Sequence, residues 1–290
     1  MNITINSSKT NENLWSKAFH KFRKDTFGMV GFVVVFIYFL ISCGVWAGLI
    51  GTQWEETTDE MWSSPSTEFW CGTNRNGQDV LERAIYGTRV AFEVGFFVAV
   101  LSTIIGAILG GFSGYFSGGL VDRIIMWIYG TLESIPFYLF VAAIGFALPD
   151  NIYSMHVAMI SVMWVQTCTI IRGEFIKIKS QEYVEAAHAI GVPTHKIIFK
   201  HIMPNTYHLL LVNATIIFVT AIKTEVILSF LGLGVKEGTS WGLMFSASAE
   251  EVAGGIYNSF ITATLFMFIL VLAFNIFSDA IQDALDPKKI

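Results

Sequence analysis

Residues 28–50 read GMVGFVVVFIYFLISCGVWAGLI, an apolar stretch without a charged side chain. The hydrocarbon core of a bilayer is about 30 Å thick, and about 20 helical residues cross it. The stretch is therefore long enough to span a membrane. It is also longer than the apolar core of a cleaved signal peptide, which has at most about 15 residues, so we expect it to be retained as the first span.

Five further apolar runs follow along the 290 residues. With the first stretch, the predicted spans cover residues 28–50, 94–116, 124–148, 155–171, 209–231 and 256–277. The chain is 53% hydrophobic and 14% charged, whereas roughly a quarter of the residues in a soluble domain are charged. The sequence predicts an all-α polytopic membrane protein with about six transmembrane helices within residues 28–290. The net charge of −5 gives no indication of a nucleic-acid partner.

The distribution of Lys and Arg predicts the orientation. With the N-terminus inside, four of the 18 basic residues fall on outer segments, Lys223 lies within a span, and the rest fall on inner segments. The inner residues are Lys9, Lys17, Lys21, Arg23, Lys24, Arg123, Arg172, Lys177, Lys179, Lys196, Lys200, Lys288 and Lys289. Because cytoplasmic loops carry the excess of Lys and Arg, we expect both termini in the cytoplasm. The loops over residues 51–93 and 232–255 then face outward, and a polar insert over residues 172–208 is cytoplasmic.

The first 27 residues are polar and form a predicted cytoplasmic segment. Trp15, Phe19 and Phe22 recur within it at helical spacing among Lys and Arg. Such a face is typical of a helix that lies on the membrane surface. A short solvated helix that leads into the first span is the alternative.

The insert over residues 172–208 has the signals of two short helices. Ser180 can cap a first helix, and Gly191 is suited to the turn that ends it. Thr194, after Pro193, can cap a second helix. One apolar face is predicted on the first helix, formed by Tyr183, Ala186 or Ala187, and Ile190. From these signals alone, an ordinary amphipathic connector folded back on the bundle is an equal alternative.

The order of residues in this insert is more specific than its helices. Glu185-Ala186-Ala187 is followed by Gly191 after three residues and later by Pro204. This order resembles the EAA signature of permease subunits of ATP-binding-cassette importers. His201 and Met203 depart from it, standing where Ile and Leu are usual. The resemblance implies a coupling helix that seats in a groove of an ATPase subunit. The coupling residues that it implies are Tyr183, Glu185, Ala186, Ala187, Gly191 and Pro204.

Other motifs extend the resemblance to the dipeptide, oligopeptide and nickel permeases, over about residues 25 to 288. They are Gly72-Thr73, Gly77, Asp79-Val80-Leu81, Tyr86-Gly87, Arg89-Val90, Gly118-Gly119, Asp122, Pro136, Arg172, Glu174, Tyr183-Val184, residues 228–234, Trp241-Gly242 and residues 283–287. Gln78 stands where Arg is usual, and Glu93 where an apolar residue is usual. The cargo implied is a peptide, with nickel or a metallophore as the alternative.

The resemblance also implies partners. They are a related permease subunit that forms a heterodimer, two cytoplasmic ATP-binding subunits that bind ATP and Mg, and an extracytoplasmic solute-binding protein. The setting would be a bacterial inner membrane. The chain itself has no Gly-x4-Gly-Lys-Ser/Thr loop, so we expect no ATPase activity and no catalytic residue in it. His188, His195, His201 and His208 lack the compact spacing of zinc ligands, so no metal site is predicted.

Three charged residues fall inside predicted spans and are candidates for a transport pathway, because charge within a bilayer is costly. They are Glu133, Lys223 and Glu225. The alternative for Glu133 is a protonated or hydrogen-bonded packing residue, and the alternative for Lys223 and Glu225 is a place at an interface or in packing between subunits. Pro136 can kink the helix beside Glu133. An ion-driven secondary transporter with Glu133 as a proton relay is a more remote alternative function, as is a structural scaffold.

Overall fold

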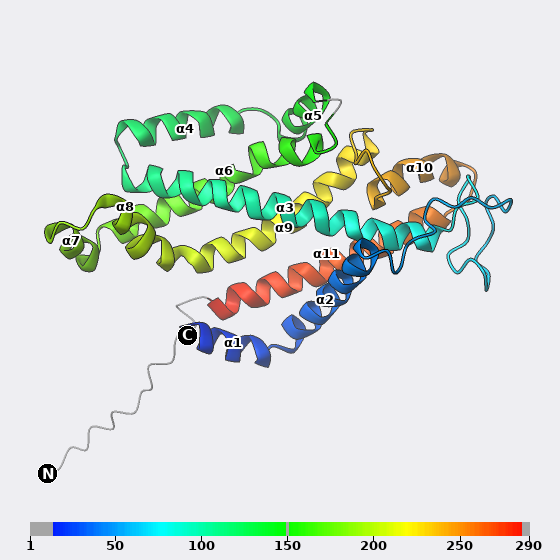
Figure 1. Ribbon diagram of the computed structural model, residues 1–290, viewed down its shortest axis with the longest axis horizontal. Helices are drawn as coiled ribbons and strands as arrows, with labels where there is room; N and C mark the ends of the chain where they lie inside the picture. Colours follow the sequence, from blue (N-terminus) through cyan, green and yellow to red (C-terminus); the bar gives the residue numbers. More distant parts are fainter. Residues whose placement is uncertain (1–13, 149–150, 286–290) are drawn as a thin grey trace, which may run out of the picture.

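The structure is a computed structural model that describes residues 14–148 and 151–285 as a long bundle of helices (Figure 1). The described elements are α1 (Leu14–Lys24), α2 (Thr26–Trp46), α3 (Val80–Tyr115), α4 (Leu120–Glu133), α5 (Phe137–Ala147), α6 (Ser154–Lys179), α7 (Glu182–Ala189), α8 (Thr194–Lys196), α9 (Tyr207–Phe230), α10 (Trp241–Ala253) and α11 (Asn258–Leu285). A π-helical turn (Ile197–Ile202) and a 3-10 turn (Met203–Thr206) join α8 to α9. The all-α prediction is confirmed. We call the two ends of the bundle the α7 end and the α10 end.

Five helical segments are long and apolar enough to cross a membrane: α2, α3, α6, residues 194–230 and α11. The span expected over residues 124–148 is broken into α4 and α5, which are bent by 94° relative to each other. Pro136 explains the break, because it lacks a backbone N–H and disfavours the helical conformation of the residue before it. The count of about six spans is confirmed if this bent pair is one span.

Helix α3 begins at Val80 rather than at Val94, so residues 80–93 are helical and not part of the outward loop. Asp79 explains the early start, because its carboxylate accepts hydrogen bonds from the backbone N–H of Leu81 at 2.7 Å and of Glu82 at 3.4 Å. With 36 residues, α3 is about 54 Å long and exceeds the thickness of a bilayer core.

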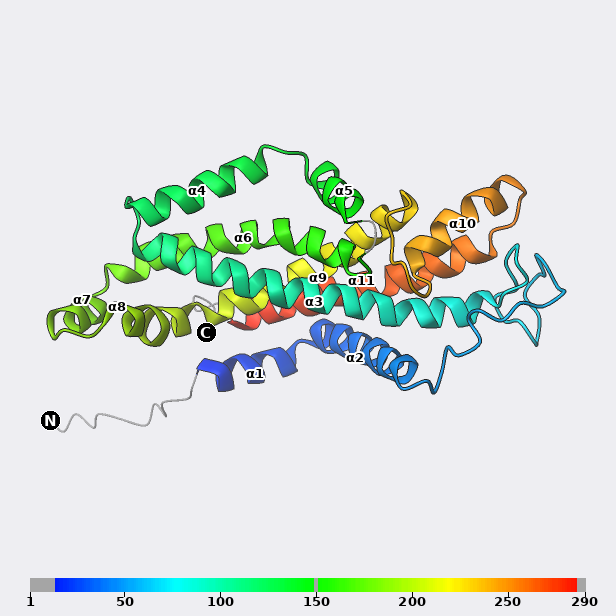
Figure 2. The ribbon, with the colours of Figure 1, turned by 45° about the horizontal axis from the view of Figure 1, so that its top comes forward.

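Helices α3 and α6 pack side by side in the centre of the bundle (Figure 2). Gly106, Gly110 and Gly114 recur every four residues on the contact face of α3. A Cβ atom at Gly110 would lie 2.4 Å from the carbonyl oxygen of Cys168, and one at Gly106 would lie 2.5 Å from the Cβ atom of Thr167. Only glycine therefore permits this approach, which is typical of helices that pack inside membranes.

Helix α10 lies in the segment expected to be a loop over residues 232–255. Ser240 caps it by accepting a hydrogen bond from the Leu243 N–H at 3.2 Å. Trp241 is 1% exposed, and its indole N–H donates to the Ala84 carbonyl at 2.9 Å. This tryptophan fixes α10 to the first turns of α3, around Ala84.

Helix α1 confirms a helix in the polar N-terminal segment. Phe22 packs edge-on against Phe32 and Phe277, and Ala18 is buried, whereas Phe19 is exposed. The predicted aromatic face is thus divided between the bundle and the surroundings, and the side chain of Trp15 lies outside the described residues. Contact of α1 with the membrane surface stays a prediction.

Candidate coupling surface and translocation cavity

The insert folds as a helix, a turn and a second helical segment at the α7 end (Figure 1). The two predicted caps are wrong. Ser180 ends α6 and donates to the Lys177 carbonyl at 3.0 Å, while Gln181 precedes α7 without a side-chain cap. Thr194 is the first residue of α8, and Pro193 occupies the cap position. Glu182 and Glu185 lie in the first turn of α7, where the positive end of the helix dipole favours carboxylates.

Gly191 forms the turn that the sequence predicts. Its φ of +81° is in the left-handed region, which glycine adopts without a steric penalty. Its N–H donates to the His188 carbonyl at 3.0 Å, and the N–H of Val192 donates to the Ala187 carbonyl at 3.1 Å. These bonds satisfy carbonyls at the end of α7 and reverse the chain.

Two sides of α7 have different surroundings. Val184 and Ala187 are buried, and Val184 joins an apolar cluster that includes Ile178 of α6 and Ile197. The adjacent side is apolar but exposed, formed by Tyr183, Ala186 and Ile190, of which Ile190 is 81% exposed. We call these three residues the α7 outer face. The choice that the sequence left open is resolved, since Ala187 points inward and Ala186 outward.

The 3-10 turn that contains Pro204 lies beside α7. Asn205 bridges the two, because its amide donates to the Tyr183 hydroxyl at 3.0 Å and to the His201 carbonyl at 2.7 Å. Partial burial raises the pKa of Tyr183 above its ordinary value, and the bond from Asn205 opposes this shift. The predicted coupling residues are therefore brought together at the α7 end, with Tyr183, Glu185, Ala186, Gly191 and Pro204 exposed and Ala187 buried.

A buried ion pair lies at the base of this insert. Arg172 of α6 donates to both carboxylate oxygens of Asp122, from Nε at 2.8 Å and from Nη2 at 3.0 Å. Asp122 is 5% exposed and also accepts from the Ser113 hydroxyl at 2.5 Å and the Gly118 N–H at 2.8 Å. We call these four residues the Asp122 clamp. It ties the connection between α3 and α4 to α6, about two turns before α6 ends.

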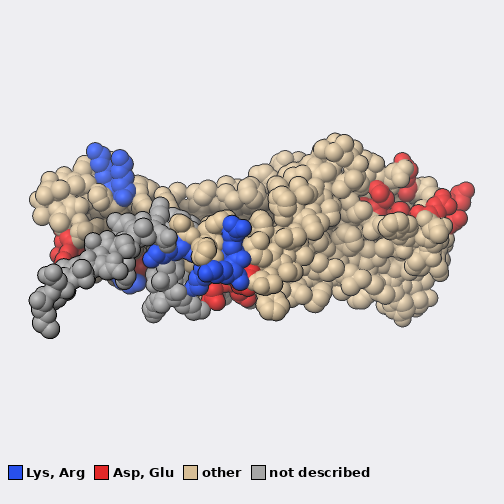
Figure 3. Space-filling view, turned by 90° about the horizontal axis from the view of Figure 1, so that it is seen from below, with Lys and Arg blue, Asp and Glu red and all other residues tan. Residues whose placement is uncertain are grey.

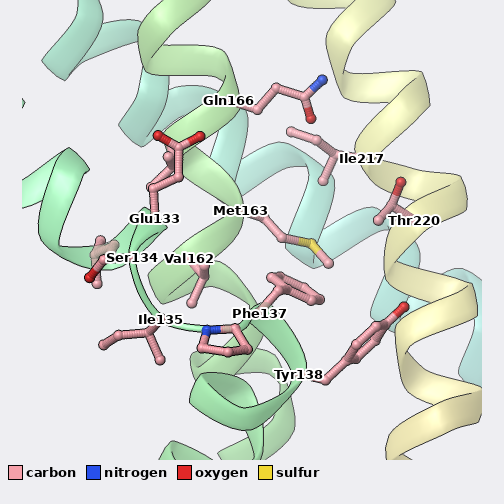
Figure 4. Close-up of a pocket in the computed structure, with 13 residues that line it drawn as sticks. Glu133, Ser134, Ile135, Phe137, Tyr138, Val162, Met163, Gln166, Ile217 and Thr220 are labelled. Atoms are coloured by element: carbon pink, nitrogen blue, oxygen red, sulfur yellow. The ribbon is translucent and has the colours of Figure 1, made fainter.

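A cavity of about 580 Å³ separates the bent pair α4 and α5 from α6 and α9. Its lining is mostly apolar, and Glu133, Gln166 and Thr220 are among its polar members. Figure 4 shows Glu133 on the side of α4, Gln166 on α6 and Thr220 on α9. Glu133 is exposed and lies one helical turn after Tyr129 on α4. The structure thus places this candidate pathway residue at a cavity.

Lys223 and Glu225 are not brought to this cavity. The Lys223 side chain is exposed on α9. Glu225 is 3% exposed and accepts a hydrogen bond from the Ser229 hydroxyl at 2.6 Å, close to Ser240 at the start of α10. Glu225 is thus buried within the chain near the start of α10. A pathway role for Glu133, Lys223 or Glu225 stays a prediction.

Comparison with known proteins agrees with this geometry. Residues 102–290 match the family described as the binding-protein-dependent transport system inner membrane component. The chain belongs to this family. As a binding-protein-dependent permease, it is a multi-pass membrane protein and supplies the membrane component of a transport system. The resemblance stated from the sequence is confirmed.

Relatives of this permease match it along nearly its whole length. The oligopeptide transport system permease protein OppC of Bacillus subtilis is 35% identical over 97% of this chain and 92% of its own length. The dipeptide transport system permease protein DppC of the same organism is 33% identical over 93% of this chain and 85% of its own. The glutathione transport system permease protein GsiD of Shigella flexneri is 33% identical over 94% and 90%.

Sequence reasoning missed several residues that shape these sites. Asn205 and Ser113 had no distinguishing pattern. Asp122 and Arg172 were noticed only as family motifs, because 50 residues separate the two partners of the ion pair. Ser240 before Trp241 was a usable signal for the start of α10.

Proposed function

We propose that this chain is one of two permease subunits of an ATP-driven, binding-protein-dependent importer of peptides in a bacterial inner membrane. Its partners would be a related permease, two cytoplasmic ATP-binding subunits that hold ATP and Mg, and an extracytoplasmic solute-binding protein. The relatives support this proposal, since they are named as oligopeptide, dipeptide and glutathione permeases and match over 85% or more of their lengths.

The observation that carries the proposal is the α7 outer face. It presents an apolar side chain that is 81% exposed, Ile190, beside Tyr183 and Ala186. An exposed apolar patch rimmed by polar residues is typical of a surface that binds another protein. The buried Val184 fixes α7 to Ile178 of α6 and to Ile197, so a force on α7 reaches α6 and α9 together. Closure of the ATP-binding subunits would thereby shift the helices between two states.

The distribution of charge supports the proposed orientation. On the face seen in Figure 3, Lys and Arg lie towards the α7 end together with some Asp and Glu, whereas the charged side chains visible at the far end are Asp and Glu. This separation is what the positive-inside rule expects if the α7 end is cytoplasmic. The ATP-binding subunits would then meet α7, and the solute-binding protein would meet the α10 end.

The cavity between α5, α6 and α9 supports a peptide as cargo. Its few polar groups, including Glu133, Gln166 and Thr220, are set among apolar side chains, so it could admit peptides of varied sequence. Membership in the family favours ATP-driven import over ion-driven transport. The burial of Glu225 against Ser229 also leaves that carboxylate without access to the cavity.

Site-specific crosslinking tests the coupling role. A chain with Ile190→Cys, purified with its ATP-binding subunits, should crosslink to them, and the yield should change when ATP is added. The matched control is Val184→Cys, which lies on the buried side of the same helix and should give no crosslink. Crosslinks of equal yield from both positions, or none from Ile190→Cys in a complex that still transports, would refute the coupling role.

Uptake measurements test the cargo. Cells that depend on this importer should accumulate a radiolabelled tripeptide, and Ile190→Arg should lower uptake roughly tenfold or more because it buries a charge in the docking surface. The amount of the chain in the membrane should stay unchanged, since Ile190 is exposed in the isolated chain. Accumulation of nickel instead of the tripeptide would overturn the peptide assignment and leave the coupling role intact.

A further inference from the structure

A second, polar cavity of about 290 Å³ lies at the α10 end, away from the cavity of Glu133. Helix α3, the beginning of α6 and the segment that follows α9 enclose it. Its lining includes Arg89 and Glu93 of α3, His156 of α6, and Lys236 and Glu237. The two full positive and two full negative charges balance, which suits a ligand that carries both signs.

His156 indicates that a ligand belongs in this cavity. Its side chain is more than nine-tenths buried, at 8% exposure, and lines the cavity. Neither ring nitrogen has a hydrogen-bond partner within residues 14–148 and 151–285. Buried polar groups in proteins are nearly always hydrogen-bonded, because an unpaired one costs free energy. A bound molecule with an oxygen acceptor would supply the missing partner.

Arg89 and Glu93 retain bonding capacity for such a molecule. They lie one helical turn apart, and the closest approach of guanidinium and carboxylate is 3.8 Å, which is too long for a direct hydrogen bond. Arg89 is held in place by Tyr86, whose hydroxyl accepts a bond at 3.3 Å and whose ring lies beneath the guanidinium. The pair thus offers a positioned cation and a carboxylate beside His156.

The polar cavity continues into an apolar groove. A neighbouring cavity of about 490 Å³ shares Arg89, Glu93 and His156 with it. From there it continues along apolar side chains: Trp46, Phe97, Leu101, Val157 and Ile160. Trp46 and Tyr153 at its rim are about half exposed, and such aromatic residues are enriched where the headgroups meet the hydrocarbon. A polar site for a headgroup that continues into an apolar groove for an acyl chain matches the shape and polarity of a phospholipid.

This groove and the cavity of Glu133 lie on opposite faces of α6. Val157 lines the groove and Gln166 lines the other cavity. The two residues are nine positions apart, which is about two and a half helical turns. A molecule in the groove is therefore separated from the candidate transport cavity by the body of α6.

We propose that the groove binds a phospholipid with a primary ammonium headgroup, a phosphatidylethanolamine, from the leaflet at the α10 end. Arg89 and His156 bind the phosphate oxygens, and Glu93 accepts hydrogen bonds from the ammonium group. One acyl chain lies along Phe97, Leu101 and the apolar side of α6. Lys236 and Glu237 close the headgroup site towards the water.

Photolabelling tests this site on the full chain. The chain is placed in phosphatidylcholine vesicles that contain a small fraction of phosphatidylethanolamine with a diazirine near the glycerol end of one acyl chain. After illumination and digestion, the label should map to peptides that contain Phe97 to Leu101 and Val157 to Ile160. Arg89→Gln should lower this labelling about tenfold, the effect of losing one charge-assisted hydrogen bond. Arg75→Gln, in the exposed pair with Glu250 outside the bundle, is the matched control and should leave it unchanged.

Two further variants separate this site from general lipid contact. Leu101→Trp fills the exposed groove without changing a charge and should also lower the labelling. Glu93→Gln should abolish the preference for unlabelled phosphatidylethanolamine over phosphatidylcholine as competitor, because the quaternary ammonium of choline cannot donate a hydrogen bond. Labelling that is spread evenly over α3, or that none of these variants alters, overturns the proposal. Protection of the groove by a co-expressed partner permease would also overturn it and assign this face to a subunit interface.

Discussion

Substitution of Asp122 by Asn is the most informative perturbation of this fold. The Asp122 carboxylate receives four hydrogen bonds, two from Arg172 and one each from Ser113 and Gly118, while only 5% of the residue is exposed. Breaking one partner of a buried, hydrogen-bonded ion pair typically costs about 3–5 kcal/mol. Asparagine keeps the shape and one acceptor, and the Arg172 side chain is 28% exposed and can reach water. We therefore expect Asp122→Asn to lower the free energy of unfolding by about 2–3 kcal/mol.

Reversible unfolding in mixed micelles, followed by tryptophan fluorescence during titration with a denaturing detergent, measures this loss. Arg172→Gln and the double variant complete a cycle, and we expect the two partners to couple by about 1.5–3 kcal/mol. The control is Glu174→Gln, which removes the more exposed ion pair with Lys177 on the same helix and should cost less than about 1 kcal/mol. Equal losses from Asp122→Asn and Glu174→Gln, or strict additivity in the cycle, would refute the reasoning.

Three further substitutions follow from the packing. Gly110→Val should lower the thermal unfolding temperature of the purified chain sharply, because even a Cβ atom at this position would lie 2.4 Å from the Cys168 carbonyl oxygen. An unchanged melting curve would contradict the close approach of α3 to α6. Gly191→Val should cost about 1–2 kcal/mol in the same detergent titration because of the positive φ, while Gly191→Asn should be tolerated better. Trp241→Ala should lower the free energy of unfolding by about 3–5 kcal/mol, since it empties a fully buried site and removes the hydrogen bond to the Ala84 carbonyl. It should also expose α10 to limited proteolysis. Proteolysis at the wild-type rate would argue against Trp241 as the anchor of α10.

The sequence predicted the spans well because their signal is local. An apolar run such as residues 28–50 leaves no other way to satisfy the backbone in a membrane than a helix. The same local signals predicted the turn at Gly191 and the helices on either side of it. The caps at Ser180 and Thr194 failed because each residue lies within one position of a helix boundary, where sequence signals are least precise.

Features that depend on tertiary contacts were not predictable in the same way. The charged residues Glu82, Arg83 and Arg89 made residues 80–93 resemble a loop, although contact with α10 through Trp241 buries part of this segment as a helix. The choice between Ala186 and Ala187 required knowing where Ile197 lies. The candidate coupling residues could be grouped from the sequence through their motif, whereas the cavity beside Glu133 depends on the bend between α4 and α5 at Pro136.

The length of α3 allows a small tilt of this helix to produce a large displacement at its end. Trp241 is hydrogen-bonded to Ala84 near one end of this helix, and the Arg172 backbone lies against Gly114 near the other end. A stiff rod of about 54 Å that pivots in the bilayer moves one tip relative to the other by roughly 0.9 Å for each degree of tilt. A rotation of about 5° would thus displace the α10 end by almost 5 Å while every backbone hydrogen bond in α3 stays intact. A movement of α3 at one surface of the membrane is in this way transmitted to the other surface through a single unbroken helix.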